Sequence, residues 1–103
     1  MASRLLFTRT AERDRDRILD YLAHDLSSLQ AAGHFLDELE ASLMRICEYP
    51  ELYALSKYTY LAYLGYRPCP VLNYLLLYQY DREADETVVG RIFHGSQDFA
   101  KLI

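Results

Sequence analysis

The first half of the chain repeats hydrophobic residues at the spacing of α-helices. Ile18, Leu22 and Leu26 lie four residues apart, which marks the buried face of a helix over residues 11–26. A second stripe steps by three and four residues and predicts a helix that ends before Pro50. Its members are Leu29, Ala32, Leu36, Leu39, Leu43 and Ile46. Because the break between the two helices is short, we expect an antiparallel helical hairpin.

Hydroxyl side chains precede both predicted helices. Thr8 or Thr10 can cap the first helix, and Ser27 or Ser28 can cap the second. A capping oxygen accepts a hydrogen bond from an N–H group that the first turn of a helix leaves unpaired. The pattern leaves both choices open.

The second half of the chain changes to the composition of β-strands. Residues 73–80 are apolar on both faces, so we expect both faces of this strand to be covered. Residues 87–94 form its partner strand across a charged turn at residues 81–86. Residues 66–71 contain two prolines, which cannot donate to a β-ladder, and are predicted to form an edge strand. A short apolar run at residues 4–8 predicts one more strand.

These elements follow the order β-α-α-β-β-β and end in a short C-terminal tail. The order predicts an α+β fold in which the two-helix hairpin packs on a small antiparallel sheet. Residues 56–65 are expected to form a loop or a short irregular element, and the tail has room for one helical turn starting at Asp98. At 103 residues the chain is predicted to be one domain, residues 1–103.

Charge and composition narrow the classes of partner. The formal net charge is -4, and residues 1–56 hold six arginines against ten acidic residues. Non-specific nucleic-acid binding needs a basic surface, so we do not expect direct binding to nucleic acid. No apolar run approaches the roughly 20 residues of a membrane span, and the N-terminus does not follow a signal-peptide pattern. We therefore expect a cytoplasmic protein without membrane contacts, in which Cys47 and Cys69 are buried thiols.

Three side chains are the strongest candidates for chemistry. His94 follows a predicted strand and could act as an acid, a base or a ligand, although a structural role at the strand end is the expected one. Arg67 and Arg91 are expected to be solvated or salt-bridged, with phosphate or carboxylate recognition as the alternative. His24 and His34 complete no ligand spacing with His94. The residues alone predict no metal site, no cofactor and no catalytic constellation.

Three stretches taken together resemble the ParE/RelE superfamily of bacterial type II toxins. They read "HFLDELEASLMRICEYPELY", "YLAYLGYRPCPVLNYLLLYQYD" and "VGRIFHGSQDF", and the likeness runs from Phe7 to Phe99. The resemblance implies a growth-inhibiting toxin that a cognate antitoxin neutralises. It also implies that the antitoxin lays an extended or helical segment over a groove and a sheet edge, for which the proline-containing strand at residues 66–71 is one expected place.

The resemblance further implies a choice between two activities. RelE-like members cleave mRNA in the ribosome with a set of basic residues; the first falls on Arg67, but the others fall near Leu75 and on Gln97, which are uncharged. ParE-like members bind DNA gyrase and need no catalytic set. The resemblance therefore favours a protein-binding inhibitor of gyrase or another topoisomerase. An endoribonuclease acting through Arg67 and His94 and a non-toxic, antitoxin-binding relic remain alternatives. The candidate contact residues are Tyr66, Arg67, Arg91, His94, Gln97 and Phe99.

Overall fold

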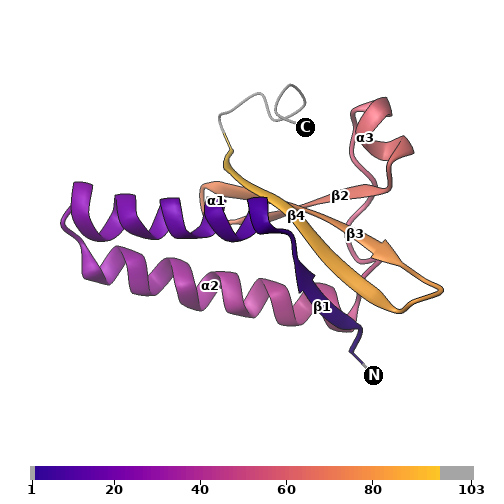
Figure 1. Ribbon diagram of the computed structural model, residues 1–103, viewed down its shortest axis with the longest axis horizontal. Helices are drawn as coiled ribbons and strands as arrows, with labels where there is room; N and C mark the ends of the chain where they lie inside the picture. Colours follow the sequence, from indigo (N-terminus) through magenta and orange to yellow (C-terminus); the bar gives the residue numbers. More distant parts are fainter. Residues whose placement is uncertain (1, 96–103) are drawn as a thin grey trace.

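Two long helices lie against one face of a four-stranded sheet (Figure 1). The structure is a computed structural model that describes residues 2–95. Its elements are β1 (Arg4–Phe7), α1 (Arg9–Asp20), the π-helical turn η1 (Tyr21–Asp25), α2 (Leu29–Glu48), α3 (Thr59–Tyr63), β2 (Tyr66–Val71), β3 (Tyr74–Asp81) and β4 (Glu86–His94). The predicted α+β order is confirmed. The helical turn predicted at Asp98 lies outside the described residues.

The expectation of an antiparallel sheet is wrong at one edge. The strand order is β1-β4-β3-β2, and the β2–β3 and β3–β4 pairs are antiparallel. However, β1 runs parallel to β4, with Arg4 opposite Glu86 and Phe7 opposite Val89. The helical hairpin and two further strands separate β1 from β4 in the chain, so no tight turn forces them to be antiparallel. Side-chain alternation also carries no information about strand direction, and the sheet is therefore mixed.

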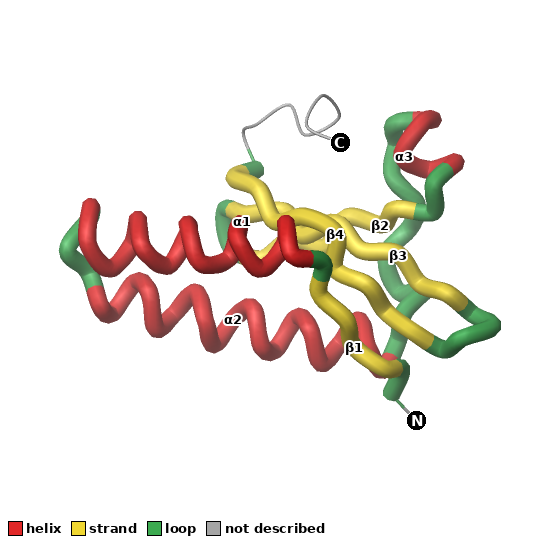
Figure 2. Tube along the Cα trace, viewed as in Figure 1, coloured by secondary structure: helices red, strands yellow, loops and turns green. Residues whose placement is uncertain are grey.

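The main core lies between the helices and the sheet, as Figure 2 shows for the two layers. Phe35 and Ile46 of α2 are fully buried there, together with Leu76 of β3. Three residues of the predicted helical stripes are exposed instead: Leu26, Leu29 and Leu36, at 52%, 79% and 44%. Leu26 and Leu29 lie at the hairpin turn, which extends beyond the sheet (Figure 1). Leu36 is one residue past Phe35, which places it about 100° around the helix from the buried side.

A smaller cluster covers the opposite face of the sheet. Leu61 of α3 packs there with Leu77 and Phe93, and the rings of Tyr58 and Tyr66 lie against them. The short helix α3 therefore covers part of the face that α1 and α2 leave open (Figure 2). The prediction that residues 73–80 are covered on both faces is confirmed by these two clusters.

A β-bulge in β4 allows the strand to serve both clusters. Leu77 is opposite Arg91 and Tyr78 is opposite Val89, so Gly90 is the extra residue. The bulge resets the alternation, and Val89 and Ile92 consequently both face the main core. The ring of Tyr66 lies over Gly90, where an added Cβ would be 3.0 Å from a ring carbon.

Candidate functional site

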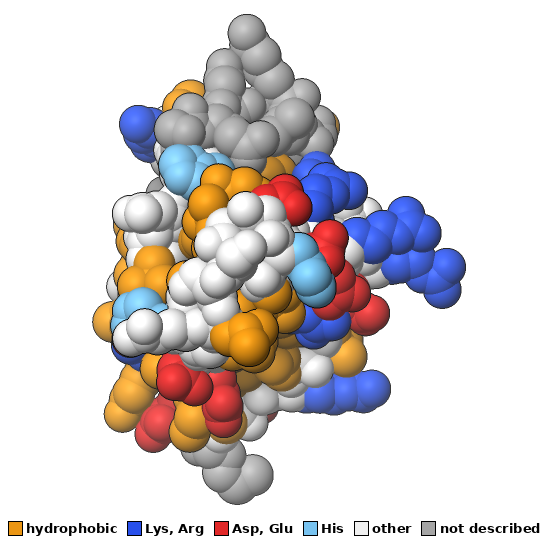
Figure 3. Space-filling view, turned by 90° about the vertical axis from the view of Figure 1, so that its left-hand side faces the viewer, with side chains coloured by type: hydrophobic (Ala, Val, Ile, Leu, Met, Phe, Trp, Pro, Cys, Tyr) orange, Lys and Arg blue, Asp and Glu red, His pale blue; other side chains and the backbone are white. Residues whose placement is uncertain are grey.

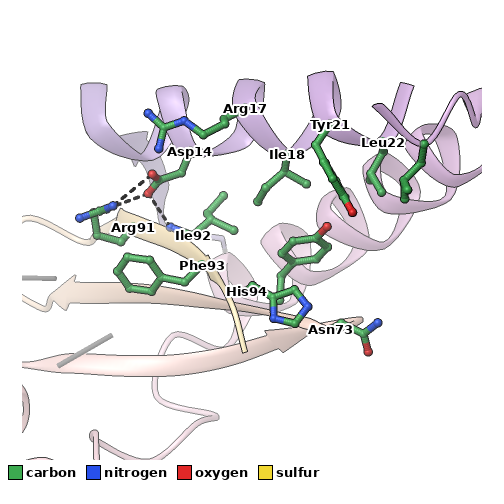
Figure 4. Close-up of a pocket in the computed structure, with 12 residues that line it drawn as sticks. Asp14, Arg17, Ile18, Tyr21, Leu22, Asn73, Arg91, Ile92, Phe93 and His94 are labelled. Atoms are coloured by element: carbon green, nitrogen blue, oxygen red, sulfur yellow. Dashed lines mark hydrogen bonds and ion pairs between the residues drawn. The ribbon is translucent and has the colours of Figure 1, made fainter. Parts of the chain in front are cut away.

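A cavity of about 660 Å³ opens between α1 and the end of β4 (Figure 4). Its walls are apolar, because Ile18 and Leu22 of α1 and η1 face Tyr74 and Ile92 of the sheet. Its rim is polar, and includes Arg17, Tyr21, Asn73 and His94. Concave sites with apolar walls and a few polar groups are typical of binding sites.

Asp14 builds the wall of this cavity by completing the sheet edge. β1 is paired with β4 only as far as Val89, and side chains from the start of α1 continue from there. Asp14 is 5% exposed, and its Oδ2 accepts a hydrogen bond from the backbone N–H of Ile92 at 2.9 Å. The hydroxyl of Thr8 donates to the carbonyl oxygen of Gly90 at 2.9 Å. Side chains thus take the place of a strand beside residues 90–92.

The same carboxylate binds Arg91. Asp14 accepts from Arg91 Nε at 2.8 Å and from Nη2 at 3.2 Å, a bidentate pair (Figure 4). The Arg91 guanidinium also lies 4.5 Å from the ring centroid of Phe93. Arg91 is therefore held as a structural cation, and its charge is balanced by Asp14. In residues 2–95, no carboxylate lies within ion-pair distance of Arg17, so Arg17 is the cation that the rim presents.

His94 lies at the mouth of the cavity on an aromatic stack. Its ring meets Tyr74 edge-on, with centroids 5.6 Å apart and an interplanar angle of 81°. Tyr74 in turn meets the buried ring of Phe35 at 5.1 Å. Burial raises the pKa of Tyr74, and nearby Tyr21 adds to the shift. The exposed imidazole is thus positioned by ring contacts that reach the core.

Arg67 is engaged far from this cavity. Its Nη1 donates to the carbonyl oxygen of Tyr53 at 2.6 Å, and its Nη2 lies 3.9 Å from Glu51. Its cross-strand partner Tyr78 donates from its hydroxyl to the carbonyl oxygen of Pro50 at 2.7 Å. Both side chains therefore hold the loop that follows α2.

The structure does not bring the residues of the endoribonuclease alternative together. Arg67 is aligned with Tyr78, whereas His94 is aligned with Tyr74. Four residues along β3 separate these positions by about 13 Å, and two strand spacings add about 10 Å across the sheet. Arg67 is opposite Tyr78, so these two side chains share one face of the sheet. Leu75 is three residues from Tyr78 along β3, and the alternation of side chains therefore turns it to the other face. Tyr66 packs on that opposite face too.

Two predicted contact residues, Gln97 and Phe99, lie outside the described residues.

Sequence reasoning missed Asp14. It lies in the charged run "ERDRDR", a pattern that is typical of a solvated helix start. A signal was present, since Asp14, Ile18 and Leu22 are spaced four apart and Asp14 therefore belongs to the buried stripe.

The end of the molecule that carries the helical turn shows a mixed surface. Figure 3 shows hydrophobic side chains gathered over the middle of this end and basic side chains, lysine or arginine, along one margin. The exposed apolar residues of this region include Tyr21, Leu26 and Leu29.

Within residues 2–95, no group of three or more His, Cys, Asp or Glu side chains is arranged to hold a metal ion. No helix in the same part of the chain has the length and apolar character needed to cross a membrane.

Both cysteines are buried free thiols, as predicted. Burial raises the pKa of Cys47 and of Cys69. Because the thiolate is the nucleophile and the metal ligand, raised pKa values make both thiols unreactive.

Residues 5–99 match the family described as "ParE toxin of type II toxin-antitoxin system, parDE". Among solved structures, the chain is similar to a chain of the toxin-antitoxin complex RelBE2 from Mycobacterium tuberculosis. That likeness has 19% sequence identity and a TM-score of 0.63, and covers 91% of this chain and 99% of the other. A chain of the chromosomal ParDE system from P. aeruginosa is similar at 17% identity and a TM-score of 0.62, covering 90% and 96%. A search of curated proteins finds no match.

Proposed function

We propose that this chain, which belongs to the ParE toxin family of type II toxin-antitoxin systems, inhibits growth by binding a topoisomerase, DNA gyrase. A cognate antitoxin neutralises it, and both proteins act in the cytoplasm. The toxin acts by contact with a protein surface and performs no reaction of its own. The family assignment supports the toxin role, and the site supports the mode of action.

The single observation that carries the mode of action is the placement of Arg67. RNA cleavage needs cations and a proton acceptor gathered around one phosphate. Arg67 is instead bound to the loop carbonyl of Tyr53, at the far end of the sheet from His94. A net charge of -4 also gives little attraction for ribosomal RNA.

The cavity beside α1 suits contact with a protein better than catalysis. Its apolar walls can accept a hydrophobic side chain, and Arg17 and His94 on the rim can meet polar or acidic groups. Arg91 also lines the cavity, where the ion pair with Asp14 holds its guanidinium. We therefore propose His94 and the residues around it as part of the surface that contacts the target.

Induction of the chain alone in bacteria tests the proposal. We expect growth arrest with intact transcripts and with loss of negative supercoiling in a reporter plasmid. Co-expression of the cognate antitoxin is expected to restore growth. Cleaved transcripts with normal plasmid supercoiling would support the endoribonuclease alternative, and unimpaired growth would support the non-toxic relic.

The variant His94→Ala tests whether His94 belongs to the surface that contacts the target. His94 is exposed, so we expect the variant to fold normally and to weaken growth inhibition by removing a contact. His24→Ala is the matched control. His24 is an exposed histidine of η1 that is paired with Asp20 of α1, and it lies outside the cavity lining. Equal growth inhibition by the two variants would remove His94 from the proposed contact surface.

A further inference from the structure

The turn between β2 and β3 holds a leucine in a conformation that leucine rarely adopts. Leu72 has a φ of 55°, which lies in the left-handed region. Together with Asn73 it forms the two-residue turn that connects the two strands. In the left-handed region the Cβ of an L-residue crowds a neighbouring carbonyl oxygen, so glycine or asparagine usually fills such turn positions. A leucine at this position strains the backbone.

The other two residues of this kind carry side chains that ease the same conformation. Among residues 2–95, the remaining non-glycine residues with a positive φ are Ser27 and Asp85, at 49° and 52°. Ser27 Oγ donates a hydrogen bond to the carbonyl oxygen of His24 at 3.2 Å. Asp85 Oδ1 accepts one from the hydroxyl of Tyr80 at 2.8 Å. Leu72 has no polar side-chain atom and is 46% exposed, so neither a side-chain hydrogen bond nor full burial offsets its strain.

The surrounding structure fixes this turn in place. Val71 and Tyr74 are paired across the two ends of the turn. Val71 is buried in the main core, and the ring of Tyr74 packs against that core. The carbonyl oxygen of Asn73 accepts a hydrogen bond from the N–H of Gly95 at 2.7 Å. The backbone of Leu72 is therefore held from both sides, which is the condition under which a strained residue persists.

The turn borders the cavity beside α1. Asn73 lines this cavity together with His94 (Figure 4). On the helical side of the same cavity, Tyr21 and Leu26 are 47% and 52% exposed. Leu72 directly precedes Asn73, and its exposed fraction is similar to theirs. Half-exposed apolar side chains around a concave site are typical of a surface that binds another protein.

We propose that Leu72 is a further contact residue for the target protein and extends the contact surface beyond the cavity. An apolar side chain of the target packs on Leu72, next to the part of the target that enters the cavity. Because the turn is already rigid, it presents this leucine with little ordering cost on binding. The inference rests on the proposed function in one respect, which is that the cavity contacts the target. It does not require the target to be gyrase.

The test compares growth arrest and thermal stability of the full chain and its variants. Leu72→Asn removes the apolar side chain and supplies a residue that tolerates the left-handed region. We expect the amount of chain needed to arrest growth to rise at least about fivefold. The melting temperature should rise, or stay within about 3 °C of the natural value. Leu72→Met keeps an apolar side chain and should recover most of the inhibition.

Leu55→Asn is the matched control. Leu55 is 47% exposed and lies outside the cavity lining. It precedes Ser56, whose N–H donates to Tyr66 at the other end of β2 from the turn. We expect this variant to arrest growth at an amount within about twofold of the natural chain.

Three results would overturn the proposal. The first is arrest by Leu72→Asn at the same amount as the natural chain. The second is an equal loss of inhibition in Leu72→Asn and Leu55→Asn. The third is a large fall in the melting temperature of Leu72→Asn, which would show that this side chain serves the fold.

Further measurements keep this inference distinct from the proposed function. Growth arrest that depends on Leu72 but leaves purified gyrase active would overturn the gyrase target alone. Equal inhibition of gyrase by the natural chain and by Leu72→Asn would overturn the inference alone. Absence of growth arrest by the natural chain would overturn both. Full arrest by Leu72→Asn that the co-expressed cognate antitoxin no longer relieves would assign Leu72 to the antitoxin contact, and would also overturn the proposal.

Discussion

At the scale of single residues, Asp14 connects the first helix to the last strand. It receives three hydrogen bonds from β4, two from Arg91 and one from the Ile92 backbone. Asp14→Ala removes the carboxylate that Arg91 binds and the acceptor of the buried Ile92 N–H, and we expect a loss of about 3 kcal/mol in the free energy of unfolding, measured in urea. Asp14→Asn keeps one acceptor and should lose about half as much.

The control for this prediction is Asp16→Asn. Asp16 is paired with Arg15, but its side chain is 67% exposed. Water screens such a pair, so the change should stay within about 0.5 kcal/mol. Equal losses for Asp14→Ala and Asp16→Asn would contradict the role given to Asp14.

Tyr78 gives the molecule a dependence on alkaline pH. Burial raises its pKa from 10.0 to about 12. The unfolded chain therefore loses this proton first, and ionisation favours unfolding. The contribution of Tyr78 is fully present below pH 10 and is lost as the pH rises toward 12, by up to roughly 2 kcal/mol. Across this range, the free energy of unfolding should fall more steeply with rising pH for the natural chain than for Tyr78→Phe.

The same variant has an effect at neutral pH. Tyr78→Phe removes the hydrogen bond to the carbonyl of Pro50 and should cost about 1 kcal/mol. Tyr63→Phe, at a side chain that is 86% exposed, should leave the neutral-pH stability unchanged. A pH dependence that is identical with and without the Tyr78 hydroxyl would contradict this account.

At the scale of elements, Thr8 joins β1, α1 and β4. Its Oγ1 accepts from the N–H of Ala11 at 3.1 Å as the cap of α1, and donates to Gly90 at 2.9 Å. Thr8→Val removes both bonds and should cost about 2 kcal/mol, while Thr8→Ser should be close to neutral. Ser28→Ala removes only the cap of α2 and should cost about 1 kcal/mol. Thermal unfolding of the three variants measures these losses in stability. A larger loss for Ser28→Ala than for Thr8→Val would contradict the prediction.

The elements that could be predicted from the sequence are those with local causes. The stripe of α2 and its end before Pro50 follow from helical periodicity, and the strands β3 and β4 follow from their aromatic and β-branched residues. The parallel pairing of β1 and the bulge at Gly90 depend on segments far apart in the chain, which periodicity does not record.

The site could be predicted only in part, for the same reason. The sequence alone indicates His94 as a candidate, because it shows a histidine beside a glycine at the end of a strand. Its stack on Tyr74 requires the β3–β4 register. The bidentate partner of Arg91 is 77 residues away in the chain, so its identity required the fold.

At the scale of the whole molecule, charge sets the kind of partner. The net charge of -4 gives little overall attraction for RNA, and Arg67 and Arg91 are already bound to groups of the chain itself. We expect no saturable binding of a labelled single-stranded RNA at micromolar chain and physiological salt, measured by fluorescence anisotropy. Tight binding that weakens steeply with added salt would contradict this expectation.

The most direct test of the central claim is a supercoiling assay with purified DNA gyrase and the purified chain. The account predicts a dose-dependent loss of supercoiling that His94→Ala weakens, that His24→Ala preserves, and that the cognate antitoxin reverses. Full gyrase activity at saturating amounts of a chain that still arrests growth would contradict it.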